Sequence, residues 1–124
     1  MAQEQNITVT QEDAEIGTVR IADEVVATIV AYAAMEVEGI SSLSGNITAD
    51  EIAAAGYKKL SKAVKVEVTG ETVQVNIEVI LGFGYNIPST CSQLQTRIKN
   101  AIANMTGLTA SDINIRIAGI AGMN

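Results

Sequence analysis

The stretch 64–81, VKVEVTGETVQVNIEVIL, decides the fold class of this chain. Apolar and polar residues alternate along it on both sides of a turn at residues 69–72. Such alternation is typical of strands with one buried and one solvated face, so the stretch predicts a β-hairpin. The polar face carries Lys65, Glu67, Gln74, Asn76 and Glu78. That face is therefore either exposed to solvent or covered by polar groups.

A helix and a last strand are predicted after the hairpin. The segment 82–88, GFGYNIP, leaves the hairpin, and Pro88 suits the first turn of a helix. Apolar residues then recur at steps of three and four, which predicts an amphipathic helix closed by Thr106-Gly107. The apolar stripe of this helix comprises Cys91, Leu94, Ile98, Ala101, Ile102 and Met105. Residues 113–117 alternate again and predict a strand.

The part of the chain before the hairpin predicts a strand and a helix, followed by a less regular stretch. Residues 17–21 alternate as a short strand, and Asp23 and Glu24 suit a helix N-terminus. The helix that follows is apolar on most sides and ends near Gly39, so we expect it to be buried against a sheet or a second copy of itself. Residues 39–43 are consistent with a strand that ends at Gly45. Residues 50–62 show a short helical pattern that Gly56 interrupts.

Together these elements predict an α+β fold, a small mixed sheet with helices packed on one face, containing a β-hairpin followed by a helix and a strand. A chain of 124 residues with 48% hydrophobic residues supports one domain. We predict a flexible tail over residues 1–14, a single domain over 15–120 and a short tail over 121–124.

Charge and cysteine content restrict the class of protein. The net charge of −6 disfavours binding to nucleic acid, which needs clustered cations. Lys58, Lys59, Lys62 and Lys65 form the densest basic group, which is either a small docking patch for anions or, as we favour, a solvated face. A single cysteine fits a reducing compartment, and no signal peptide or spanning segment is visible. We therefore expect a cytoplasmic protein without direct membrane insertion.

The residues for ordinary catalysis are missing from the sequence. The chain has no histidine, and Cys91 lies on the predicted apolar stripe, where core packing is the better interpretation. Three pairs of carboxylates fit a helix start or solvated turns rather than a metal or acid–base site; they are Asp23/Glu24, Glu36/Glu38 and Asp50/Glu51. Gly82 and Gly84 are not followed by the residues of a phosphate-binding loop. We predict no enzymatic activity, no cofactor and no catalytic or metal-binding residues.

The segment after the hairpin is the best candidate for an interaction surface. It places Phe83 and Tyr85, two of the four aromatic residues of the chain, next to glycines in a loop. The candidate surface comprises Phe83, Tyr85, Asn86 and Pro88. For the two rings themselves, we favour the interpretation that they cover the open end of the core between helix and sheet over a role in interaction.

The order of short motifs along residues 15–120 resembles the bacterial alkaline-shock-protein family, also called the envelope stress response or general stress protein family. The motifs are GTVRI at 17–21, DEVV at 23–26, GISSL at 39–43, the hairpin with FGYNIP at 83–88, Gln95, TGL at 106–108 and INIRIAGI at 113–120. Ala22 departs from the family pattern, which usually has a capping hydroxyl residue there, and Ala63 departs where a glycine is common.

The resemblance implies a small cytoplasmic protein, tied to envelope or alkaline stress and to envelope or lipid homeostasis. It also implies self-association and, for some members, a membrane-embedded partner that holds the protein at the cytoplasmic face of the membrane. Our leading hypothesis is therefore a non-catalytic interaction or scaffold protein. The alternative is a small RNA- or other nucleic-acid-binding module, against which stand the acidic charge and the lack of a Gly-x-x-Gly clamp.

Overall fold

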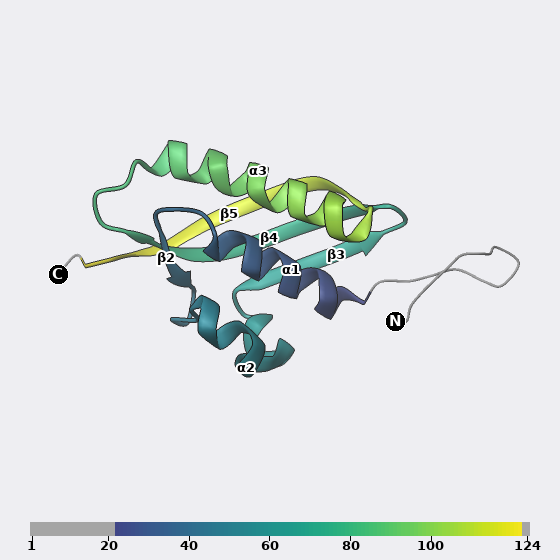
Figure 1. Cartoon of the computed structure of the whole chain (residues 1–124), viewed down its shortest axis with the longest axis horizontal. Coiled ribbons are helices and arrows are strands. Elements are labelled where there is room, and N and C mark those ends of the chain that lie inside the picture. The colour runs from purple at the N-terminus through teal and green to yellow at the C-terminus, as the bar shows by residue number, and fades with distance from the viewer. Residues whose placement is uncertain (1–21, 123–124) are drawn as a thin grey trace, which may run out of the picture.

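The computed structural model describes residues 22–122 as alternating helices and strands (Figure 1). The elements are α1 (Asp23–Met35), β2 (Ile40–Leu43), α2 (Ala49–Leu60), β3 (Val64–Thr69), β4 (Thr72–Gly82), α3 (Ile87–Thr106) and β5 (Thr109–Ala121). The strand predicted at 17–21 and the tail predicted at 1–14 lie outside the described residues.

β4 is the centre of the four-stranded sheet, because every other strand pairs with it. β5 runs parallel to it along one side, from the Thr72–Thr109 pair to the Gly82–Ala121 pair. β3 and β2 are both antiparallel to β4; β3 pairs with residues 72–77 and β2 with residues 79–81. Since β5 occupies one side of β4 along its length, β3 and β2 share the other side end to end.

The hairpin predicted at 64–81 is confirmed, with Thr69 paired to Thr72 across a turn of Gly70 and Glu71. Gly70 has a φ of 61°, which a glycine adopts without steric cost. Five alternating apolar residues of β4 are buried, on the side of the sheet that α1 and α3 cover (Figure 1). They are Val73, Val75, Ile77, Val79 and Leu81. The predicted α+β fold with a mixed sheet and helices on one face is therefore confirmed.

α1 is buried inside the fold itself. It contacts α2, α3, β2 and β3. Its buried residues are Val26, Ala27, Val30, Ala31, Ala33 and Ala34. The sequence left open whether this helix is buried against a sheet or against a second copy of itself. In the structure it is buried within its own domain, because the neighbouring elements occupy most sides of the helix. The helix also begins without a side-chain cap, since Ala22 at the N-cap position has no hydroxyl to accept a hydrogen bond.

Two local predictions need correction. α1 ends at Met35 with Glu36 in a right-handed conformation, so Gly39 does not end this helix. Gly39 instead has a φ of 105° in the turn that leads into β2. Met105 was predicted on the buried stripe of α3 but is 69% exposed, because the buried residues of α3 are Thr90, Leu94, Ile98 and Ile102.

The stretch 40–62, the least regular in the sequence, contains the two elements that its pattern indicated. β2 follows Gly39, and α2 follows a tight turn at Gly45 and Asn46. Gly56 interrupts α2 with a φ of 78° and a ψ of 162°, as its position in the helical pattern suggested. α2 packs on α1 rather than on the sheet (Figure 1).

Candidate interaction surface

The chain from the end of β4 to the start of α3 displays three large apolar side chains within five residues. Phe83 is 66% exposed, Tyr85 44% and Ile87 43%. The backbone before them is held by the sheet, because the Gly82 N–H donates to the Gly39 carbonyl at 2.7 Å and the Phe83 N–H to the Ala121 carbonyl at 3.1 Å. The loop is thus anchored at one end to β2 and β5, and its apolar side chains project from a fixed frame.

Asn86 and Pro88, the polar and cyclic members of the predicted surface, have a structural role in starting α3. The Asn86 side chain accepts a hydrogen bond from the Ser89 N–H at 2.9 Å, as an N-cap residue does. Pro88 lies in the first turn, where its missing N–H costs no hydrogen bond. Together they fix the direction in which α3 leaves the loop.

Tyr85 packs against the backbone of two glycines. A Cβ atom on Gly39 would lie 3.0 Å from Tyr85 Cδ1, and one on Gly82 would lie 3.2 Å from Tyr85 Cδ2. The absence of side chains at these two positions lets the ring lie against the turn before β2 and the end of β4. Tyr85 therefore covers the end of the fold with part of its surface, whereas Phe83 is the more exposed ring.

Ile87 joins this surface although the sequence analysis did not select it. As the first residue of α3, it lies on the same side of the helix as Leu94 and Ile98, but it is 43% exposed at the start of the helix. The signal for Ile87 in the sequence was its place just before Pro88, because the residue before a proline that starts a helix lies at the end of the preceding loop. We define the apolar loop patch as Phe83, Tyr85 and Ile87.

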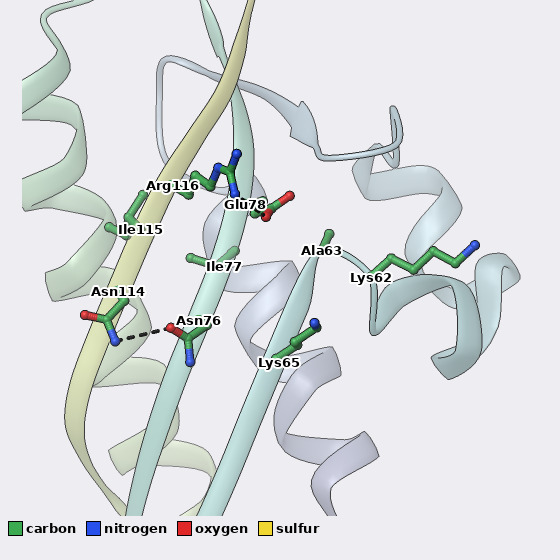
Figure 2. Close-up of a pocket in the computed structure, with 9 residues that line it drawn as sticks. All are labelled: Lys62, Ala63, Lys65, Asn76, Ile77, Glu78, Asn114, Ile115 and Arg116. Atoms are coloured by element: carbon green, nitrogen blue, oxygen red, sulfur yellow. Dashed lines mark hydrogen bonds and ion pairs between the residues drawn. The ribbon is translucent and has the colours of Figure 1, made fainter.

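The basic group predicted from the sequence is divided by the structure. Lys58 and Lys59 lie exposed at the end of α2, whereas Lys62 and Lys65 line a hollow of about 360 Å³ on the face of the sheet opposite α1 and α3. Apart from Ala63, which lies just before β3, the other side chains at the hollow come from β4 and β5 (Figure 2). They include Asn76, Glu78, Asn114 and Arg116.

Arg116 and Asn114 were not selected from the sequence, because their position depends on the register between β4 and β5. The parallel pairing places Arg116 opposite Glu78 and Asn114 opposite Asn76. The alternating pattern of residues 113–117 indicated that Asn114 and Arg116 share a polar face, but it did not indicate which strand lies beside them.

The remaining candidates for chemistry do not form a site among the described residues. Cys91 is half-buried at the flank of the α3 stripe, and burial raises the pKa of its thiol above the ordinary value. Glu36 forms an ion pair with Arg97 at 2.9 Å. Across residues 22–122 no three side chains of the histidine, cysteine, aspartate or glutamate type gather as a metal site would require.

No helix within residues 22–122 has the length and apolar character needed to cross a membrane.

Comparison with known proteins gives a family and several bacterial relatives, of which two are described here. The family model described as "Asp23 family, cell envelope-related function", a family name unconnected with residue Asp23, matches residues 11–122. The Bacillus subtilis protein YqhY is 34% identical over 109 residues, which cover 88% of this chain and 81% of the relative. The Bacillus subtilis protein YloU is 27% identical over 106 residues, or 84% of this chain and 88% of the relative. No solved structure matches the chain.

Proposed function

Because the chain belongs to the Asp23 family, the alkaline-shock-protein family with its cell envelope-related function, we propose that it is a non-catalytic scaffold that self-associates and docks on a membrane-associated protein. In this proposal it contributes to the response to envelope or alkaline stress, or to envelope and lipid homeostasis. The sequence supports a role without catalysis, since it contains no histidine and its carboxylates are scattered.

The observation that carries the proposal is the apolar loop patch. Exposed apolar residues are common on proteins when they are scattered, but Phe83, Tyr85 and Ile87 lie within five residues of one another on an anchored backbone. Aromatic side chains held in a fixed position lose little conformational entropy on binding, and such residues are typical of the centre of protein interfaces. The patch is thus suited to receive another protein.

The composition around the patch indicates the kind of partner. Residues 79–96 contain no Asp, Glu, Lys or Arg, although the chain has 22 charged residues in all, 8 basic and 14 acidic. An uncharged apolar surface is complementary to an apolar peptide segment rather than to a charged one. Together with the envelope-related function of the family, this favours an apolar segment of a membrane-associated protein as the occupant.

We expect the Phe83→Ser variant to lose binding to its partner while it stays folded. Replacing an interface anchor of this kind weakens binding by roughly thirtyfold, since such anchors contribute about 2 kcal/mol or more. The measurement is co-sedimentation with membrane vesicles from the producing bacterium. Met105→Ser is the matched control, because Met105 is equally exposed but lies at the other end of α3, and it should bind as the wild type does.

Two further preparations separate a protein partner from the lipid itself. Vesicles treated with protease should retain less of the wild-type protein than untreated vesicles do, and vesicles of pure phosphatidylcholine should not retain it. Equal retention on pure phosphatidylcholine, or equal binding by the Phe83→Ser variant and the wild type, would contradict docking through the loop patch.

Self-association is the second part of the proposal, and the edge of β5 supports it. Within the described residues β5 pairs with β4 on one side and with no strand on the other. The 13 residues of β5 include no lysine and no proline, which are the residues that commonly protect an exposed edge. A second copy could therefore extend the sheet by pairing with this edge.

Light scattering over a wide range of protein concentration tests this pairing. We expect a particle of at least twice the chain mass of 13.0 kDa at the upper end of the range. We also expect amide hydrogen exchange in β5 to slow as the concentration rises, whereas exchange in α2 should not change. A monomer at every concentration would rule out self-association.

A further inference from the structure

We propose that the hollow on the uncovered face of the sheet is a binding site for a phosphomonoester group. The phosphate site, as we call it, comprises Lys62, Lys65, Asn76, Asn114 and Arg116, with Glu78 beside them. It lies on the opposite side of the sheet from the two covering helices, and the inference does not depend on the apolar loop patch.

The sheet register brings these side chains into two neighbouring rows. Lys65 pairs with Asn76, and Asn76 pairs with Asn114, so one row crosses three strands. Glu78 and Arg116 pair in the next row on the same face. Residues two apart on a strand share a face, which makes the rows adjacent. Lys62 lies at the rim, where the chain leaves α2 and enters β3, and its side chain extends away from the other labelled side chains in Figure 2.

The charge of the site is opposite to that of the whole chain. Three cations and one carboxylate give the lining a net charge of +2, in a protein whose net charge is −6. A phosphomonoester carries about −1.5 to −2 charges at neutral pH, so it would match the excess. A carboxylate ligand would neutralise only half of it. A volume of about 360 Å³ also suits a small group rather than a flat surface contact.

Arg116 is available to a ligand because its ion pair within the protein is loose. Its Nη1 lies 3.6 Å from Glu78 Oε2, whereas the Arg97–Glu36 pair is closed to 2.9 Å. The Arg116 side chain is also 78% exposed. A guanidinium group has five N–H donors in a planar fork, and this fork fits two oxygens of a phosphate. Glu78 therefore orients Arg116 and competes weakly with the ligand.

The two asparagines provide neutral donors beside the cations. Asn114 Nδ2 donates to Asn76 Oδ1 at 3.2 Å, which orients the Asn76 amide so that its own NH₂ group remains a donor next to Lys65 (Figure 2). Hydrogen bonds to a charged oxygen are stronger than those between neutral groups. Cations that attract and amides that donate are the combination that distinguishes a phosphate site from a general basic surface.

Two double variants with the same change in net charge test the site. Lys62→Gln/Lys65→Gln removes two cations from the hollow, and Lys58→Gln/Lys59→Gln removes two from the end of α2. The probes are glycerol 3-phosphate, followed by amide chemical shifts, and vesicles of phosphatidylcholine with or without phosphatidic acid. We expect the first variant to weaken binding by about 25-fold, because each of the two cations it removes contributes about fivefold in water. The second variant should bind as the wild type does.

A third variant tests the role assigned to Glu78. Glu78→Gln removes the competing carboxylate, so we expect binding of glycerol 3-phosphate to become several-fold tighter. The largest shifts on titration should occur at Asn76, Asn114 and Arg116. An unchanged affinity in this variant would overturn the assigned geometry.

The probes also distinguish the source of the phosphate group. Binding to glycerol 3-phosphate alone supports a soluble ligand, and binding to the phosphatidic acid vesicles, with or without the soluble probe, supports a lipid head group. Failure of both probes overturns the proposal, as does equal weakening by the two double variants. Binding of a short RNA that depends on Lys62 and Lys65, when neither probe binds, would overturn it in favour of a nucleic-acid-binding module.

Discussion

Replacement of Ile98 by alanine is expected to lower the free energy of unfolding by about 2–5 kcal/mol. Ile98 is fully buried at the middle of the α3 stripe and belongs to the cluster that α1, α3 and the sheet form together. Its truncation leaves a cavity that neighbours on rigid elements fill only in part. Since small domains are stable by about 5–15 kcal/mol, this loss is a large share of the total, and urea unfolding measures it.

Met105→Ala is the matched control in the same helix. Met105 is 69% exposed, so its truncation should change the free energy of unfolding by no more than about 0.5 kcal/mol. The helical periodicity of the sequence alone would place both residues on one stripe, and it would predict similar losses. Comparable destabilisation by the two variants would therefore show that α3 is rotated relative to the orientation described above.

Gly39→Ala is expected to lower the free energy of unfolding by about 2–5 kcal/mol, which is more than backbone strain alone would cost. The φ of 105° is unfavourable for any residue with a Cβ atom, which costs about 1–2 kcal/mol. The new methyl group would also lie 3.0 Å from Tyr85 Cδ1 and 3.3 Å from Thr90 Cγ2. Crowding of this kind adds about 1–3 kcal/mol. Thermal or urea unfolding of the variant gives the sum.

A control and a double variant separate the two contributions. Gly45 has a φ of 85° and no atom within 4 Å of the position that a methyl group would occupy, so Gly45→Ala should show the strain of about 1–2 kcal/mol alone. In a background of Tyr85→Ala, the cost of Gly39→Ala should fall towards the same value, because the ring is gone. If the cost of Gly39→Ala is the same in both backgrounds, Tyr85 does not pack on Gly39.

The elements whose pattern is local were predictable from the sequence. The hairpin followed from alternation around Gly70, and α3 followed from Pro88 at its start and Gly107 at its end. The neighbours of α1 could not be predicted from the sequence, because a helix that is apolar on most sides has no single face from which to infer its orientation. The error at Met105 has a similar origin, since periodicity gives the period of a stripe but not where the sheet beneath it ends.

The two candidate surfaces also differ in how far the sequence alone predicts them. Phe83 and Tyr85 were visible in the sequence, because aromatic residues between glycines in a loop are unusual in so aliphatic a chain. The phosphate site was not, because Arg116 joins Lys65 only through the pairing of β4 with both β3 and β5. Lys58 and Lys59, which are half of the basic group predicted from the sequence, lie at the end of α2 and not at the phosphate site. Registers between distant strands depend on the packing of the whole domain.

The position of β4 between all other strands also sets the order in which the sheet can form. Its pairing with β3 closes across Gly70 and Glu71, whereas the pairs Ser42–Ile80 and Val75–Ile113 each join residues 38 positions apart. The entropy lost in closing a loop grows with its length, so the hairpin is the natural folding nucleus. Pairing β2 with β4 and pairing β5 with β4 therefore lose nearly the same loop-closure entropy. The two strands also pair with different sides of β4. Neither has to wait for the other, and the chain can reach its native state by two parallel routes.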